Sequence, residues 1–276
     1  MIELFIILIA VFTAASCALP GVFLVLRKMS LMSDAISHAV LPGIVIAFIL
    51  TRDLQSPLLI LGAAATGLLM VFIIEMVNKT KLVKEDAAIG LVFPALFSIG
   101  VIIISQSLSD VHLCESTVLV GDIALSSLNT VTVGGMDIGP KALHVMAILF
   151  LINILFISLF YKELKLSTFD PSLAASSGFS PALINYLFMG VVSVTAVGAF
   201  DAVGSILVIA LMIAPASAAY LLTDKLKNML PLSVVFGIIS AISGFYLSNL
   251  VNSSPSGSMA MTAGLIFLII YILAPG

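Results

Sequence analysis

The sequence predicts an all-α bundle of membrane-spanning helices, and three observations lead to that prediction. First, 61% of the 276 residues are hydrophobic and only 9% are charged, whereas soluble domains have about 25% charged residues. Second, long stretches have no charged residue at all, namely 4–26, 54–74, 87–109, 142–161, 202–223 and 228–276. Third, the basic residues gather in alternate connections between these stretches. The chain is therefore expected to be a polytopic membrane protein rather than a soluble domain.

Each uncharged stretch is long enough to cross a bilayer, because a spanning helix needs about 20 apolar residues. The last stretch accommodates two spans, divided by the turn-forming "NSSPSG" at 252–257. We expect eight or nine spans, at 4–26, 34–51, 56–77, 87–107, 142–161, 182–200, 203–222, 229–251 and 258–274. No basic residue precedes the first apolar run, so it is interpreted as a permanent span and not a cleaved signal peptide.

The basic residues predict the orientation of these spans. With the N-terminus outside, nine of the 11 basic residues fall in cytoplasmic connections and only Arg52 and Lys141 fall outside. Cytoplasmic loops are enriched in Lys and Arg, so this orientation is favoured, and it places the C-terminus in the cytoplasm. The connection 108–141 is expected to form a surface helix, a re-entrant segment or a further span.

The longest cytoplasmic connection, "YKELKLSTFDPSLAASSGFSP" at 161–181, contains the signals of a short helix. Asp170 is a plausible N-cap, Pro171 suits the first helical position, and Gly178 favours a stop. A short helix on the cytoplasmic face could bind a soluble partner. The alternative is an ordinary loop with a capped turn.

Two prolines are expected to interrupt spans in different halves of the chain. Pro42 lies in the span 34–51 and Pro215 in the span 203–222. Proline removes a backbone hydrogen bond and kinks a helix, and interrupted spans in both halves of a transporter indicate a binding site near the membrane midplane. Prolines are also common in membrane helices without such a role.

The stretch "MSDAISHAVLPG" places Asp34 and His38 four residues apart at the start of a span. Side chains at i and i+4 share a helix face, with Cβ atoms about 6 Å apart, so the pair could bind one divalent cation such as Mn²⁺, Fe²⁺ or Zn²⁺. Two ligands do not complete such a site, and a second copy of the chain in a homodimer could supply another Asp/His pair. A proton relay remains open, as does a structural role in which Asp34 caps the helix and His38 bonds a backbone carbonyl.

Other polar residues are weaker candidates. His112, Cys114 and Glu115 lie in an outer connection, His144 is expected at the outer end of a span, and Glu75 is expected to pair with Lys79 or Lys81. The two cysteines, Cys17 and Cys114, are too few for a disulfide framework. The chain contains no G-x-x-x-x-G-K-[ST] phosphate loop and no H-E-x-x-H motif. These absences disfavour an intrinsic ATPase and an intramembrane zinc protease.

Four segments resemble the membrane permeases of bacterial ABC importers for manganese, zinc or iron. They are "LMSDAISHAVLPGI" (31–44), "EDAAIGLVF" (85–93), "FYKELKLSTFDPSLAASSGFSP" (160–181) and "VGSILVIALMIAPASAAYLL" (203–222). The segment "GGMDIGPKALHVM" (134–146) is similar to the manganese and iron branch. The resemblance runs from about residue 20 to the C-terminus.

The resemblance implies a single permease domain over 1–276 with the vitamin-B12-importer-like type II fold, in the bacterial plasma (inner) membrane. It implies that Asp34 and His38 form the metal site and that Pro42 and Pro215 shape the pathway. It further implies a coupling helix at about 169–179, where Phe169, Asp170, Pro171, Ser172 and Gly178 meet the ATPase. The implied partners are an identical or sibling permease, two cytoplasmic ABC ATPase subunits and an external metal-binding lipoprotein.

We therefore expect a non-catalytic permease subunit that forms the translocation pathway for a divalent transition metal, with Mn²⁺ favoured over Zn²⁺ and Fe²⁺. No permanently bound cofactor and no nucleic-acid partner are expected. The alternative is a stand-alone proton-coupled metal carrier that uses the same Asp34 and His38. The capped segment at 169–179 disfavours that alternative, because a carrier does not need a docking helix.

Overall fold

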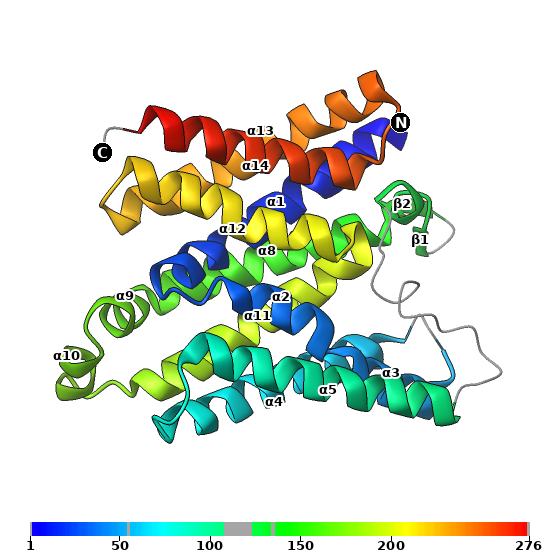
Figure 1. The fold of residues 1–276 in the computed structure, drawn as a ribbon. Coiled ribbons are helices and arrows are strands. Elements are labelled where there is room, and N and C mark those ends of the chain that lie inside the picture. Colours follow the sequence, from blue (N-terminus) through cyan, green and yellow to red (C-terminus); the bar gives the residue numbers. More distant parts are fainter. Residues whose placement is uncertain (1, 54–55, 108–122, 134–135, 275–276) are drawn as a thin grey trace. The chain divides into compact units, whose positions relative to one another are not determined.

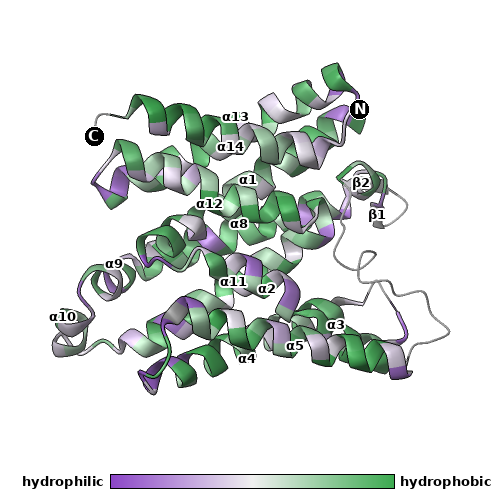
Figure 2. Cartoon of the chain, in the orientation of Figure 1, coloured by the Kyte–Doolittle hydropathy of each residue, from purple (hydrophilic) through white to green (hydrophobic). Residues whose placement is uncertain are grey.

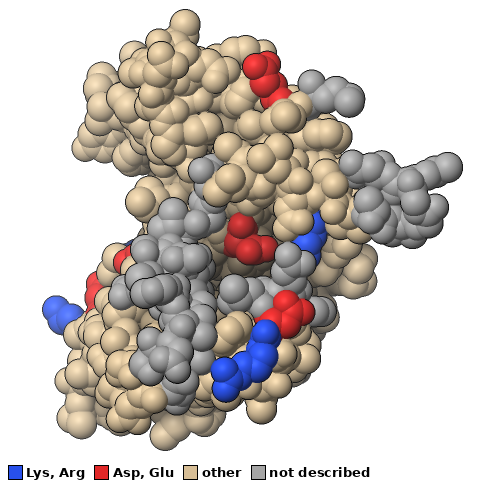
Figure 3. Space-filling view, turned by 90° about the vertical axis from the view of Figure 1, so that its right-hand side faces the viewer, with Lys and Arg blue, Asp and Glu red and all other residues tan. Residues whose placement is uncertain are grey.

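In a computed structural model of the chain, nine helices are long and apolar enough to span a membrane within the described residues, which are 2–53, 56–107, 123–133 and 136–274 (Figure 1). They are Ile2–Leu26, Leu31–Thr51 (one span made of two consecutive helices, α2 at Leu31–Ala39 and α3 at Leu41–Thr51), Leu58–Lys79, Asp86–Gln106, Lys141–Leu159, Pro181–Val203, Ser205–Leu222, Leu226–Val251 and Pro255–Leu273. Each lies within a few residues of a span predicted from the sequence, so the all-α polytopic fold is confirmed. Apolar residues cover most of each helix (Figure 2), and charged side chains are sparse on the face shown in Figure 3.

The contacts between elements divide the chain into two compact units. Unit 1 comprises residues 1–30, 119–158 and 198–276, with α1 (Ile2–Leu26), α7 (Ile123–Ser126), β1 (Thr130–Val133), β2 (Met136–Pro140), α8 (Lys141–Leu159), α12 (Ser205–Leu222), α13 (Leu226–Val251) and α14 (Pro255–Leu273). Unit 2 comprises residues 31–118 and 159–197, with α2 (Leu31–Ala39), α3 (Leu41–Thr51), α4 (Pro57–Lys79), α5 (Glu85–Ser107), α9 (Tyr161–Phe169), α10 (Pro171–Ser176) and most of α11 (Pro181–Val203). The single permease domain over 1–276 stays a prediction.

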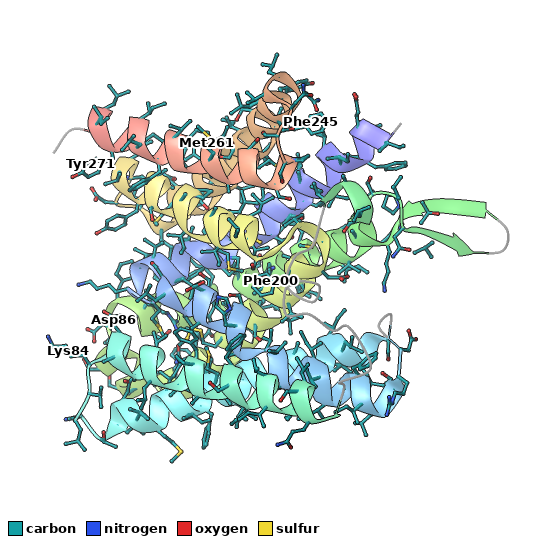
Figure 4. The ribbon with its side chains drawn as sticks, turned by 45° about the vertical axis from the view of Figure 1, so that its right-hand side comes forward. Lys84, Asp86, Phe200, Phe245, Met261 and Tyr271 are labelled. Atoms are coloured by element: carbon teal, nitrogen blue, oxygen red, sulfur yellow. The ribbon has the colours of Figure 1, made fainter. Side chains whose placement is uncertain are left out.

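In unit 1, α1 packs against α12 and α13, and α14 packs against the same two helices. Small residues allow this close packing, as is usual between helices in a membrane. A Cβ added at Gly21 of α1 would collide with the carbonyl group of Met212 on α12. The Phe245 side chain of α13 is buried, whereas Met261 and Tyr271 of α14 are exposed (Figure 4). The outer side of α14 is therefore an apolar surface suited to lipid.

A buried polar contact joins α1 to α8 in the same unit. Pro20 has no N–H group and so leaves the carbonyl oxygen of Ser16 without its usual donor four residues later. The Asn153 side chain of α8 donates to that oxygen at 3.3 Å, and the Ser16 hydroxyl donates to the Met146 carbonyl oxygen at 3.1 Å. Both Ser16 and Asn153 are fully buried. The interhelical bonds therefore compensate for the proline, which is required where no water is present.

In unit 2, α3 and α4 approach each other through glycines. A Cβ added at Gly43 would collide with the backbone of Gly62, and the reverse substitution would collide with Gly43. On its other side α4 contacts α11, where the ring centroids of Phe72 and Tyr186 lie 6.4 Å apart. Helix α5 packs against α2, α3 and α4. Helices α3 and α4 thus form a closely packed pair, beside which α2 and α5 lie.

The connection between α5 and α8 is not a span over the part that the structure describes. Residues 123–126 form the short helix α7, and β1 and β2 form an antiparallel hairpin in which Thr132 pairs with Asp137. The hairpin was not expected, because alternating residues in so short a segment give only a weak signal for strands. The choice between a surface helix, a re-entrant segment and a further span stays a prediction, because 108–122 lie outside the described residues. His112, Cys114 and Glu115 lie outside the described residues.

We predict that Asn153→Ala lowers the free energy of unfolding by about 1–3 kcal/mol, because it leaves the buried Ser16 carbonyl oxygen without a donor. The measurement is the thermal unfolding transition of the tagged protein in detergent, followed by size-exclusion chromatography. Asn228→Ala is the matched control, since Asn228 is exposed in the first turn of α13.

A second substitution identifies the cause of the loss. Pro20→Ala provides a backbone N–H at position 20 and is expected to recover part of the lost stability in the Asn153→Ala background. Equal losses with and without Pro20→Ala would contradict the role assigned to Asn153.

Candidate metal site and docking helix

The span predicted at 34–51 consists of two helices rather than one. Helix α2 ends at Ala39 and α3 begins at Leu41, with Val40 between them and Pro42 in the first turn of α3. Because Pro42 has no N–H group, the carbonyl oxygen of His38 cannot receive the hydrogen bond that would continue α2. The break therefore lies directly after His38 and makes α2 a short separate helix.

The carbonyl oxygen of Val40 accepts several hydrogen bonds at this break. It accepts from the backbone N–H groups of Gly43 at 3.1 Å and Ile44 at 3.2 Å, and from the Thr66 hydroxyl of α4 at 3.4 Å. The N-terminus of α3 is held against α4 mainly by the close contact of Gly43 with Gly62. The single Thr66 O–H proton is shared, because the carbonyl oxygens of Ala63 and Gly62 are closer to this hydroxyl, at 3.0 and 3.1 Å. The sequence analysis did not identify Thr66 or Gly62.

Asp34 and His38 lie together on one face of α2. The distance from His38 Nε2 to Asp34 Oδ1 is 3.7 Å. The His38 side chain is 38% exposed and the Asp34 side chain is 47% exposed. Their neighbours Ser33, Ala35 and Ser37 are buried. A carboxylate oxygen and an imidazole nitrogen are therefore accessible side by side, which are two ligands suited to a divalent transition metal.

Two phenylalanines of α5 contact the imidazole ring of His38. The ring centroid of Phe97 is 5.9 Å away and its plane is nearly perpendicular, at 88°. The ring centroid of Phe93 is 6.1 Å away at an interplanar angle of 33°. Sequence analysis did not identify either residue, although their i, i+4 spacing in "FPALF" at 93–97 matches the spacing of Asp34 and His38.

No group of three or more His, Cys, Asp or Glu side chains that could hold a metal occurs within the described part of the chain. His144 lies at the start of α8, with Nδ1 3.0 Å from the Pro140 carbonyl oxygen, and Cys17 is buried in α1. Asp34 and His38 are therefore two possible ligands. Any further His, Cys, Asp or Glu ligand would have to come from residues outside the described part of the chain or from another chain.

Glu75 does not form the ion pair that the sequence suggested. Among the described residues its hydrogen-bond partner is the Tyr186 hydroxyl of α11, and no ion pair joins it to Lys79 or Lys81. The expected pairing is wrong because Glu75 is near the inner face of α4 toward α11, whereas both lysines are exposed. The side of α4 on which Glu75 lies depends on the packing of α4 against α11. Spacing along the sequence does not indicate contacts between helices that are distant in the chain.

The segment predicted at about 169–179 forms α10, from Pro171 to Ser176, directly after α9 ends at Phe169. The Asp170 carboxylate accepts hydrogen bonds from the Ser172 hydroxyl at 2.6 Å and from the Leu173 N–H group at 2.9 Å. Both hydrogen bonds lower the pKa of the Asp170 carboxyl, and the bond from Ser172 has the larger effect. The Asp170 side chain that caps α10 is therefore ionised at neutral pH.

The end of α10 is equally well defined. Gly178 has a φ of +88°, its N–H group donates to Ala175, and the N–H group of Phe179 donates to Ala174. This is the Schellman arrangement, which favours glycine at that position. The side chains of Phe169 and Leu173 are 58% and 49% exposed. Helix α10 is therefore capped at both ends, and two exposed apolar side chains lie in this segment, Phe169 at the end of α9 and Leu173 in α10.

Pro215 differs from Pro42 in its effect. Helix α12 continues from Ser205 to Leu222 with Pro215 inside it, so this helix is not divided into two. Pro215 is buried, and its proposed influence on the pathway stays a prediction.

Comparison with known proteins places the chain in a family. Residues 4–274 match the family described as the ABC 3 transport family. The chain is 46% identical over 273 residues to the manganese transport system membrane protein MntD of Bacillus subtilis, covering 99% of this chain and 92% of that protein. It is 49% identical over 270 residues to the zinc transport system membrane protein TroD of Treponema pallidum, covering 98% and 73%.

Solved structures agree with this result. PsaBC from Streptococcus pneumoniae, in complex with a Fab, superposes with a TM-score of 0.79 at 32% identity, covering 98% of this chain and 91% of the other. A putative metal-chelate type ABC transporter in an inward-facing conformation gives a TM-score of 0.66 at 16% identity, covering 98% and 85%, and supports the type II fold. The chain belongs to the ABC 3 transport family, as a multi-pass membrane permease subunit of an ATP-binding-cassette transporter.

Proposed function

We propose that this permease subunit forms the translocation pathway of an importer for a divalent transition metal, and that Asp34 and His38 bind the ion in transit. The proximity of the two side chains on the accessible face of α2, with Nε2 and Oδ1 3.7 Å apart, is the observation that supports the site. Ionisable groups at membrane depth are costly and usually have a function. Relatives are named for manganese, zinc and iron, and these ions accept carboxylate and imidazole ligands.

A second permease copy, identical or a sibling, would complete the site. Transition metals in proteins generally have four or more ligands, and α2 supplies two. A matching pair from the second copy would bring the number to four. Two oxygen and two nitrogen ligands without a thiolate suit an ion that must be released, and they are compatible with Mn²⁺, Zn²⁺ and Fe²⁺. The relatives named for manganese support Mn²⁺ as the first of these candidates.

ATP hydrolysis would take place in separate cytoplasmic subunits that contact α10. Support comes from the capping of α10 at both ends and from two exposed apolar side chains, Leu173 of α10 and Phe169 at the end of α9. An external metal-binding lipoprotein would deliver the ion to the outer face. A stand-alone proton-coupled carrier is not favoured, because the relatives are subunits of ABC transport systems.

The N-terminus would lie outside and the C-terminus in the cytoplasm of a bacterial plasma membrane. Nine spans that alternate in direction would then place the connection between α4 and α5, marked by Lys84 and Asp86 in Figure 4, on the cytoplasmic side. Lys162 and Lys165 of α9 would lie on the same side. The excess of basic residues in cytoplasmic loops supports this orientation.

We predict that Asp34→Ala and His38→Ala each reduce manganese uptake by roughly tenfold to a hundredfold or more, since changing even an indirect partner of a metal costs that much. The measurement is uptake of radiolabelled manganese by proteoliposomes that contain the assembled transporter and ATP. His144→Ala is the matched control, because its imidazole bonds a backbone carbonyl in α8.

Retained uptake in both variants, with normal assembly, would refute the site. The same vesicles distinguish the carrier alternative. The chain without its ATPase subunits is expected to transport no metal under an imposed proton gradient, and uptake under those conditions would contradict the importer assignment.

We predict that Asp170→Ala weakens the association of the ATPase subunits, because α10 loses the acceptor for its Leu173 N–H group. Asp170→Asn keeps a capping oxygen and is expected to retain association. Co-purification of the ATPase with each variant and ATP-driven uptake are the measurements. Equal association of the alanine and asparagine variants would argue against a docking role for the capped helix.

A further inference from the structure

We infer that Phe93 and Phe97 of α5 are positioning residues that fix the imidazole ring of His38 for metal binding. This inference rests on the proposed function of His38 as a metal ligand and adds the residues that determine its orientation. The packing of α5 against α2 would then set the geometry of the metal site.

A metal-binding histidine is usually oriented by a hydrogen bond from its second ring N–H to a carboxylate, a carbonyl or water. Within the protein, the His38 ring contacts the two aromatic rings of α5 and the Asp34 carboxylate. The 3.7 Å between Nε2 and Asp34 Oδ1 is longer than a hydrogen bond, for which 2.7–3.2 Å is typical. Asp34 therefore does not fix the ring.

His144 shows the contrast within the same chain. Its Nδ1 lies 3.0 Å from the Pro140 carbonyl oxygen, which holds that ring by an ordinary hydrogen bond. Rotation about the last side-chain bond of histidine has only broad preferences. The His38 ring therefore needs another restraint if it is to present Nε2 to a metal beside Asp34.

The two phenylalanine rings provide that restraint. Phe97 presents a nearly perpendicular ring at 5.9 Å, and Phe93 a tilted ring at 6.1 Å, both within the range of favourable aromatic contacts. Phe93 and Phe97 are four residues apart, so they lie on one face of α5. That face is turned toward His38 of α2. Rotation of the imidazole would break both contacts.

The register of α5 along α2 and α3 is also fixed. A Cβ added at Gly100 would lie 3.0 Å from both the Pro42 nitrogen and Leu41 Cγ, so the α5 backbone lies close to the break between α2 and α3. On either side of Gly100, Phe97, Ile103 and Ile104 of α5 pack against the cluster of Leu41, Val45 and Phe48. This packing prevents α5 from sliding and keeps Phe93 and Phe97 beside His38.

A fixed ring should increase affinity because less ordering is required when the metal binds. The contact itself is apolar and donates no ligand. Its loss should therefore weaken binding and alter the ligand geometry without removing the site, which is a different result from the loss of His38 itself.

The test compares Phe97→Leu, Phe93→Leu and Phe97→Tyr in the assembled transporter without ATP. We expect each leucine variant to weaken Mn²⁺ binding by about tenfold, at the lower end of the effects of indirect partners, and the tyrosine variant, which keeps the ring, to retain affinity near that of the unmodified protein. Mn²⁺ binding is measured by electron paramagnetic resonance. Co²⁺ substituted for Mn²⁺ reports the ligand geometry through its visible spectrum, which a purely structural role would not change.

Phe72→Leu is the matched control, because it removes an aromatic contact with Tyr186 between α4 and α11 of the same unit and should leave Mn²⁺ binding unchanged. Size-exclusion chromatography with the ATPase subunits verifies assembly. If a leucine variant does not assemble, Phe97→Met replaces it, since methionine fills an irregular apolar space without a ring.

The outcomes separate this inference from the proposed function. Unchanged Mn²⁺ affinity and an unchanged Co²⁺ spectrum in the leucine or methionine variants, together with lost binding in His38→Ala, would overturn the positioning role and leave the metal site in place. Unchanged binding in His38→Ala would overturn both. Weaker binding in the variants without a ring, with retention in Phe97→Tyr and Phe72→Leu, supports the inference.

Discussion

The structure depends above all on the requirement that backbone polar groups in lipid find partners within the protein. Helices meet this requirement by themselves except at prolines, which leave a carbonyl oxygen without its backbone donor. Pro20 and Pro42 illustrate two different solutions. At Pro20 the freed carbonyl oxygen of Ser16 accepts a bond from Asn153 of α8. At Pro42 the helix breaks instead, and the Val40 carbonyl oxygen accepts bonds from α3 and from Thr66 of α4. One proline thus joins two helices, and the other divides one.

The division at Pro42 explains the construction of the candidate site. Helix α2 is only nine residues long and contains both Asp34 and His38, while α3 is attached to α4 through Gly43 and Gly62. The potential ligands therefore lie on a short helix whose hydrogen bonds do not continue into the next one. Broken helices of this kind are typical of binding sites in transporters.

The environment of His38 combines a carboxylate with two aromatic rings. Its Nε2 lies 3.7 Å from Asp34 Oδ1, and the imidazole contacts Phe93 and Phe97. A strongly hydrogen-bonded imidazole would be a more basic ligand and would hold a metal longer. An apolar support fixes orientation without that increase in basicity, which is compatible with an ion that has to leave the site. Such a support would suit a transport site, which has to orient its ligands and still release the ion.

The sequence by itself predicted each span to within a few residues, because apolar length is a local property, and it left open whether there are eight or nine spans. It also determined α10, since Asp170, Pro171 and Gly178 form both caps within a few residues. The i, i+4 spacing of Asp34 and His38 was enough to place them on one helix face, because the period of the helix alone sets that relation. Pro42 already indicated an interruption of the span at 34–51, but the residues at which α2 ends and α3 begins came from the folded structure. So did the contact of Glu75 with Tyr186, the pairing of β1 with β2 and the contacts of Phe93 and Phe97 with His38. Most of these features depend on contacts between residues distant in the sequence, and the periodicity of a uniformly apolar helix does not indicate which of its faces meets which neighbour.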